Sequence, residues 1–101
     1  MIYLSDENYE EVMSKGNVVV DFYADWCGPC QMFGPIFENV SKKNTNFTFV
    51  KCDVDKASRP AAKFGVRSIP TIIVLKDGKL VNSALGAMDE NSFEEFLNSS
   101  K

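Results

Sequence analysis

Hydrophobic residues follow two different spacings in the first half of the chain. Residues 18–24 form a run that is apolar except for Asp21, and residues 47–53 begin as a second apolar run. Such runs are typical of strands buried on both faces of a sheet. Between them, apolar residues recur at the spacing of an amphipathic helix, at Met32, Phe33, Ile36, Phe37 and Val40. The pattern predicts a strand–helix–strand unit with parallel strands and a right-handed crossover.

The second half of the chain predicts a hairpin between two helices. Residues 71–75 and 80–84 have the composition of strands, and the Asp-Gly pair between them is a strong signal for a tight antiparallel turn. The polar segment 55–64 predicts a short helix that Gly65 closes. A last helix has Asp89 as its N-cap and buries the side chains of Phe93, Phe96 and Leu97.

The amino terminus completes the set of elements. Residues 2–4 predict a short edge strand, and Ser5 is a candidate N-cap for a helix with the apolar positions Tyr9, Val12 and Met13. The elements together predict an α/β protein with one central mixed sheet of about five strands, covered on both faces by about four helices. At 101 residues, we expect one domain that spans residues 1–101.

Composition and charge narrow the function. The chain is 45% hydrophobic and 25% charged, which is ordinary for a globular protein, and its net charge is −3 with no cluster of Lys or Arg. We therefore expect neither nucleic acid nor a membrane surface as a partner. No apolar run approaches the ~20 residues of a membrane span. The first residues lack the basic region and apolar stretch of a secretory signal, so we expect a cytoplasmic protein.

The chemistry of the chain centres on the segment Trp26-Cys27-Gly28-Pro29-Cys30, at the predicted junction of strand and helix. A helix start offers unpaired N–H groups and the positive end of the helix dipole, both of which favour a thiolate. Pro29 suits the first turn of a helix. The spacing puts the two cysteines about one helical turn apart. Two close thiols, one of them acidified, form a dithiol/disulfide redox pair.

Other interpretations of the cysteine pair are weaker. A zinc site needs about four ligands, but the chain has no His and only one further cysteine, Cys52. A structural disulfide would close a short loop and give little entropic stabilisation. Two unreactive thiols are the remaining alternative. The strand–helix–strand context favours redox chemistry, and we expect no metal. Cys52 reads as a buried core residue.

Asp21 stands in the middle of a strand that is predicted to be buried. Burial removes hydration from the carboxylate and should raise its pKa toward neutral, where the group can take up and return a proton. The alternative is an acid near a strand end that reaches solvent. Lys51 lies on the neighbouring predicted strand and is the natural electrostatic partner of Asp21, although an exposed lysine is the more common case.

Several separated segments resemble the thioredoxin family, over nearly the whole chain. The segment 20–30 looks like the active-site segment of that family, and a Gly-Pro pair between the cysteines is typical of thioredoxins rather than of glutaredoxins or disulfide isomerases. Further segments fall in the family's order, at Lys51 and Asp53, residues 64–71, residues 76–79, and Gly86-Ala87. The resemblance implies a thioredoxin fold. Gln31 departs from the family, in which many members have a basic residue at this position.

The resemblance also implies the activity, that of a monomeric protein-disulfide reductase. Electrons would come from a thioredoxin reductase supplied by NADPH, or from a ferredoxin-linked equivalent, and would pass to disulfides of target proteins. The chain has no dinucleotide or flavin motif, so we expect no bound cofactor and a redox-active disulfide between Cys27 and Cys30. The alternative is a redox-gated binding subunit or scaffold with little turnover. The intact cysteine pair and Asp21 disfavour it.

By the same resemblance, each residue at the centre has a role. Cys27 is the nucleophile, with an accessible sulfur, and Cys30 is the more enclosed resolving thiol. Asp21 is the general acid/base for Cys30, and Lys51 is the partner of Asp21. The Ile69–Pro70 peptide bond is expected to be cis, with the Ile69 backbone aimed at an extended target segment. The residues expected to contact a target, hereafter the target-binding surface, are Trp26, Gly28, Pro29, Gly65, Val66, Ile69, Pro70, Gly86 and Ala87.

Overall fold

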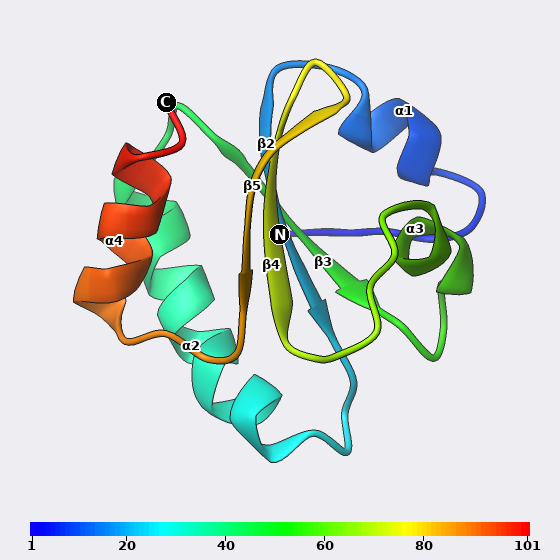
Figure 1. Ribbon diagram of the computed structural model, residues 1–101, viewed down its shortest axis with the longest axis horizontal. Coiled ribbons are helices and arrows are strands. Elements are labelled where there is room, and N and C mark those ends of the chain that lie inside the picture. Colours follow the sequence, from blue (N-terminus) through cyan, green and yellow to red (C-terminus); the bar gives the residue numbers. More distant parts are fainter.

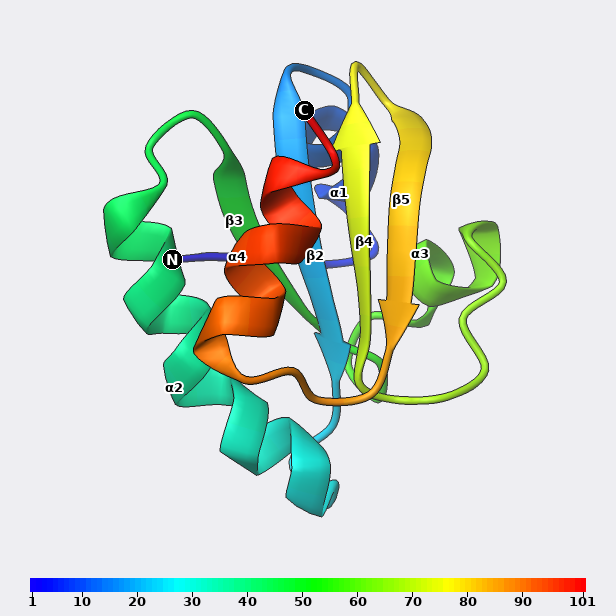
Figure 2. The same cartoon turned by 60° about the vertical axis from the view of Figure 1, so that its left-hand side comes forward.

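The computed structural model describes residues 1–101 and has a five-stranded mixed sheet between two helical layers (Figure 1). The strand order is β1-β3-β2-β4-β5. Helices α2 and α4 cover one face of the sheet, and α1 and α3 cover the other (Figures 1 and 2). In chain order the elements are β1 (Ile2–Tyr3), α1 (Tyr9–Met13), β2 (Asn17–Tyr23), α2 (Gly28–Lys43), β3 (Thr48–Asp53), α3 (Ser58–Lys63), β4 (Thr71–Lys76), β5 (Lys79–Leu85) and α4 (Glu90–Asn98).

Strand β2 is the centre of the sheet, which is why its sequence is apolar on both faces. It runs parallel to β3 on one side and antiparallel to β4 on the other. The valines at 18, 19 and 20 are fully buried. The β2–α2–β3 unit and the antiparallel β4–β5 hairpin both confirm the sequence prediction. The carboxyl end of β2 leads directly into α2, so this junction carries the two cysteines.

Each face of the sheet has its own hydrophobic core. The core beneath α1 and α3 is mostly aliphatic and includes Val20, Phe22 and Leu75. The core beneath α2 and α4 is aromatic. Phe93 of α4 lies 5.1 Å from Phe33 and 5.7 Å from Phe37 between ring centroids. This aromatic packing fixes α2 against the sheet and so holds its amino terminus in place.

One helix begins later than the sequence pattern predicts, and another lies inside its predicted segment. Helix α1 starts at Tyr9 and not after Ser5, because Ser5 and Asn8 exchange backbone-to-side-chain hydrogen bonds of 2.7 and 3.0 Å, which close a separate turn before the helix. Helix α3 starts at Ser58, after a turn in which the Asp53 carbonyl accepts hydrogen bonds from two N–H groups. Gly65 follows α3 with a φ of 65°, as its predicted role at the helix end requires.

The β4–β5 turn needs two residues with positive φ, a conformation that is unfavourable for most residues with a side chain. Asp77 and Gly78 have φ values of 49° and 84°, the left-handed conformation of a two-residue hairpin turn. We predict that Gly78→Ala lowers the free energy of unfolding by about 1 kcal/mol, measured by urea denaturation. A new Cβ would meet no atom closer than 3.7 Å, so the cost comes from the backbone. The control Lys79→Ala, at an exposed position, should change stability little, and equal losses in both variants would contradict the prediction.

The helices are short relative to a lipid bilayer. The longest, α2, has 16 residues. No helix combines the length and the apolar composition needed to span a membrane.

Candidate active site

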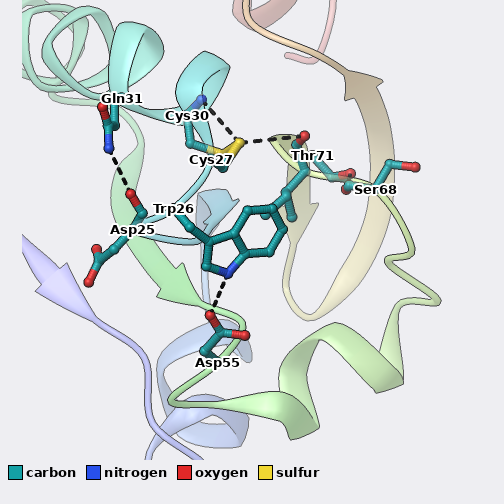
Figure 3. Close-up of a disulfide and its surroundings, with 9 residues drawn as sticks. Asp25, Trp26, Cys27, Cys30, Gln31, Asp55, Ser68 and Thr71 are labelled. Carbon is teal, nitrogen blue, oxygen red and sulfur yellow. Dashed lines mark hydrogen bonds between the residues drawn. A yellow bond between two sulfur atoms is a disulfide. The ribbon is translucent and has the colours of Figure 1, made fainter.

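A disulfide joins Cys27 and Cys30 where β2 gives way to α2 (Figure 3). The Cα atoms are 5.2 Å apart, within the usual range for a disulfide. Cys27 is the N-cap of α2, and Pro29 lies in the first turn of the helix, as the sequence predicts. The Cys27 N–H donates to the carbonyl of Ala24, 3.2 Å away, which closes the turn that brings the chain from strand to helix.

The surroundings of the Cys27 sulfur favour negative charge. The backbone N–H of Cys30 donates to Cys27 Sγ at 3.3 Å, and the sulfur also lies at the positive end of the α2 dipole. Cys27 Sγ is 3.8 Å from the carbonyl oxygen of Ile69 on the loop before β4. Once the disulfide is reduced, the Cys30 N–H and the α2 dipole, and not the Ile69 carbonyl, stabilise a thiolate at Cys27. The helix therefore supplies what a reactive thiol needs.

Exposure does not separate the two cysteines in this disulfide form. As whole residues, Cys27 is 6% exposed and Cys30 is 5% exposed, and the expected contrast between the two sulfur atoms stays a prediction. Their neighbours differ instead. Cys27 contacts the loop that carries Ile69, whereas Cys30 lines an open pocket of about 450 Å³ on the other side of the helix start, together with Lys51.

Asp21 is fully buried beneath this helix, on the same strand that leads to the cysteines. Neither carboxylate oxygen has a hydrogen-bond partner in the chain. Burial raises the pKa of Asp21 from its usual 3.8 to about 7, and the positive charge of Lys51 opposes part of that rise. The alternative of an acid that reaches solvent does not hold. Asp21 is a carboxyl group that can change protonation near neutral pH.

Lys51 is the register partner of Asp21 on the adjacent strand β3, but the two form no salt bridge. The single salt bridge of the chain joins Lys43 and Glu90 at 2.9 Å, on the exposed side of α2. Lys51 Nζ lies instead 4.6 Å from the ring centroid of Tyr23. Lys51 thus acts on Asp21 through space and not by direct contact.

The Trp26 side chain projects from the turn before α2. It is 72% exposed, so it belongs to the surface and not to the hydrophobic core. The indole Nε1 donates a hydrogen bond of 2.8 Å to Asp55 Oδ2 (Figure 3). This bond fixes the orientation of an otherwise free aromatic ring beside the disulfide.

The loop before β4 brings Ile69, one of the residues expected to contact a target, next to Cys27. The Ile69–Pro70 peptide bond is cis, and the Pro70 carbonyl accepts a 2.8 Å hydrogen bond from the Gly86 N–H. Ile69 packs against the small buried cluster of Ala24, Cys27 and Cys30. Most members of the target-binding surface are exposed or half-buried, whereas Pro70 is buried.

Three contacts at the site were not predicted from the sequence. They are the hydrogen bond from Trp26 to Asp55, the position of Lys51 over Tyr23, and a 2.7 Å hydrogen bond from Gln31 Nε2 to the Asp25 carbonyl. The first two contacts follow from the parallel pairing of β2 with β3, which places Tyr23 opposite Asp53. In this pairing the residues after each strand, which include Trp26 and Asp55, come to the same edge of the sheet. Nothing in the sequence pattern indicates the hydrogen bond of Gln31.

Metal chemistry has no set of ligands here, because no three His, Cys, Asp or Glu side chains are grouped so that they could hold an ion. Cys52 is buried on β3, and its thiol lies 3.5 Å from the Ala57 carbonyl. Burial raises the pKa of Cys52 to about 12, which keeps it a thiol at neutral pH. Cys27 and Cys30 are therefore the redox-active cysteines of the chain.

Comparisons with known proteins agree on one family. The family model described as Thioredoxin matches residues 1–99. The thioredoxin of Mycoplasmoides gallisepticum is 49% identical over 80 residues, which cover 79% of this chain and 80% of that protein. The thioredoxin of Bacillus subtilis is 37% identical over 97% of this chain and 95% of its own length. A solved structure of Plasmodium falciparum thioredoxin superimposes with a TM-score of 0.92 at 33% identity and covers 100% of both chains.

Proposed function

Because the chain belongs to the thioredoxin family, we propose that it is a general protein-disulfide reductase that receives electrons from a thioredoxin reductase. It is a thiol-disulfide oxidoreductase with a redox-active disulfide at Cys27 and Cys30. The observation that carries the proposal is the placement of Cys27 as the N-cap of α2, with the Cys30 N–H donating to its sulfur. This geometry supports attack by a thiolate at Cys27.

The proposed reaction has two exchange steps. The Cys27 thiolate attacks one sulfur of a target disulfide, the target S–S bond breaks, and a mixed disulfide forms while one target thiolate leaves. The Cys30 thiolate then attacks Cys27 Sγ, the Cys27–Cys30 bond forms, and the second target thiolate leaves. Two electrons pass from the protein to the target. A reductase supplied with NADPH returns two electrons and restores the dithiol.

Asp21 is proposed to take the proton that Cys30 loses before its attack. A carboxyl group with a pKa of about 7 can accept a proton and return it at neutral pH. The pocket of about 450 Å³ beside Cys30 gives water a place next to the resolving thiol. Lys51 is proposed to keep the proton affinity of Asp21 from rising further.

A target is proposed to bind across the target-binding surface. The Ile69 N–H has no hydrogen-bond partner within the chain, so it is free to pair with the backbone of an extended target segment. Trp26, exposed and fixed by Asp55, would cover the apolar side chains that flank the target disulfide. We further propose that the chain acts in the cytoplasm as a monomer, that residues 1–101 form one domain, and that it needs no bound cofactor.

Insulin reduction tests the proposed function. With dithiothreitol as the electron source, the wild type is expected to accelerate precipitation of the insulin B chain, and with a bacterial thioredoxin reductase it should consume NADPH when insulin is present. Cys52→Ser is the matched control, because its thiol is buried in the core on the face of the sheet opposite α2, and it should be fully active. A folded wild type that is no faster than dithiothreitol alone would contradict the reductase function and favour a binding scaffold.

A further inference from the structure

The Lys51 ammonium occupies an unusual place for a charge on an inner strand. Lys51 is half-buried, no carboxylate lies within salt-bridge distance of it, and its Nζ is 4.6 Å from the centroid of the Tyr23 ring. A cation over an aromatic face is attracted by the negative face of the ring, more so where water is partly excluded. The Tyr23 ring thus holds the Lys51 ammonium in place.

The backbone places Tyr23, Lys51 and Asp21 in one cluster. Asp21 and Tyr23 are two residues apart on β2 and therefore point to the same face of the sheet. Lys51 is the register partner of Asp21, so its side chain lies on that face too. From the helix side, a Cβ added to Gly34 would lie 3.5 Å from Lys51 Nζ. The ammonium is therefore held between the Tyr23 ring and the backbone of α2.

Other charged groups near this cluster do not determine where Lys51 lies. Asp53, on β3, accepts a 3.0 Å hydrogen bond from the Asp55 N–H instead. Asp25 and Glu38 are exposed and line the same pocket as Lys51. On the other side of β2, the register partner of Asp21 is the uncharged Ile72. On β1, the exposed Tyr3 is the register partner of Lys51. The titratable groups near Asp21 or Lys51 are thus Tyr3, Tyr23, Asp25, Glu38 and Asp53, while Cys30 is held in the disulfide.

We propose that Tyr23 is a positioning residue that holds the Lys51 ammonium against its ring and so sets how strongly Lys51 acts on the Asp21 carboxylate. This inference rests on the proposed function in one respect: if Asp21 takes the proton of Cys30, Tyr23 adjusts the proton affinity of that carboxyl group. Without the ring, the ammonium gains freedom and hydration in the open pocket that it lines. Its average distance from Asp21 then increases, and its effect on that carboxylate falls.

The phenol hydroxyl is not needed for this role. Burial, together with the nearby Asp53 charge, raises the pKa of Tyr23 to about 12, so the phenol stays neutral while Asp21 titrates. Tyr23→Phe keeps the aromatic face and is the matched control. Tyr23→Leu keeps an apolar side chain and removes the ring.

A double-mutant cycle read by NMR tests the proposal. The ¹³C shift of the Asp21 carboxyl carbon is followed against pH in the oxidised protein, with and without Lys51→Met, in three backgrounds: wild type, Tyr23→Phe and Tyr23→Leu. We expect Lys51→Met to raise the pKa of Asp21 equally in the first two backgrounds, and by about half as much or less in Tyr23→Leu. An equal rise in all three backgrounds would overturn the proposal.

A second measurement needs no variant. A lysine side chain over an aromatic face has its ε-methylene protons shifted upfield by the ring current, so we expect upfield Lys51 ε-protons in the folded wild type. Unshifted ε-protons would overturn the proposal even if Tyr23→Leu failed to fold. The role of Asp21 is tested separately, by insulin reduction with Asp21→Asn at pH 7. Unchanged turnover there would contradict the role of Asp21 while the titration still decides that of Tyr23.

Discussion

Cys27→Ser is expected to reduce insulin reduction to the level of dithiothreitol alone, whereas Cys30→Ser is expected to accumulate a mixed disulfide with the target. Cys27 Sγ sits at the helix N-cap and receives the Cys30 N–H, so it is the sulfur stabilised as a thiolate. A serine in its place cannot form the first S–S bond. Without Cys30, that bond forms but has no internal thiol to break it.

Non-reducing electrophoresis and mass spectrometry check this pair of outcomes. The trapped species should contain one target chain joined to Cys27, and dithiothreitol should release it. The double variant Cys27→Ser with Cys30→Ser serves as the control and should trap nothing. If Cys27→Ser traps the target and Cys30→Ser does not, the two roles are reversed, and the N-cap position does not select the nucleophile.

Asp21→Asn is expected to stabilise the fold by roughly 4 kcal/mol at pH 8, with a much smaller gain near pH 4. Burial raises the pKa of Asp21 to about 7 in the folded protein, while the unfolded chain keeps a value near 3.9. Between these values the folded state retains a proton that the unfolded state has lost, so wild-type stability falls as pH rises from about 4 to 7. Each tenfold difference in proton affinity corresponds to about 1.4 kcal/mol.

Urea denaturation at several pH values measures this effect. The variant lacks the ionisation, so its stability should not fall over that range on account of residue 21. Asp25→Asn, which changes an exposed acid close to the site, is the control and should follow the wild-type profile. A gain from Asp21→Asn that is the same at pH 4 and pH 8 would contradict the burial effect on the Asp21 pKa.

The parts of the fold that were predicted correctly depend on local signals. The doubly apolar run of β2 identified a central strand, because only a strand covered on both faces needs no polar side. The Asp77-Gly78 pair identified the hairpin, because its left-handed conformations are easiest for these residues. The helix starts were less certain, since Ser5 had two possible uses, and the structure uses it in a turn with Asn8.

At the site, the sequence predicted the disulfide pair, but it did not predict most of the non-covalent contacts around it. Spacing alone brought Cys27 and Cys30 together, because a separation of three residues along a helix fixes their distance. The position of Lys51 over Tyr23 depends instead on the alignment of two strands and the approach of α2. The sequence suggested a partner for Asp21, but whether that partner makes contact or acts through space is decided by packing. The Trp26–Asp55 bond likewise joins segments 29 residues apart.

The most direct test of thiol-disulfide exchange is stoichiometric and needs no reductase. The reduced wild type is mixed with insulin, quenched with acid and analysed by mass spectrometry after alkylation of free thiols. We predict that each insulin disulfide opened is matched by one protein molecule that has lost two hydrogen atoms and carries the Cys27–Cys30 disulfide, with Cys52 alkylated after unfolding. Insulin that stays intact while the protein keeps both thiols would contradict the account.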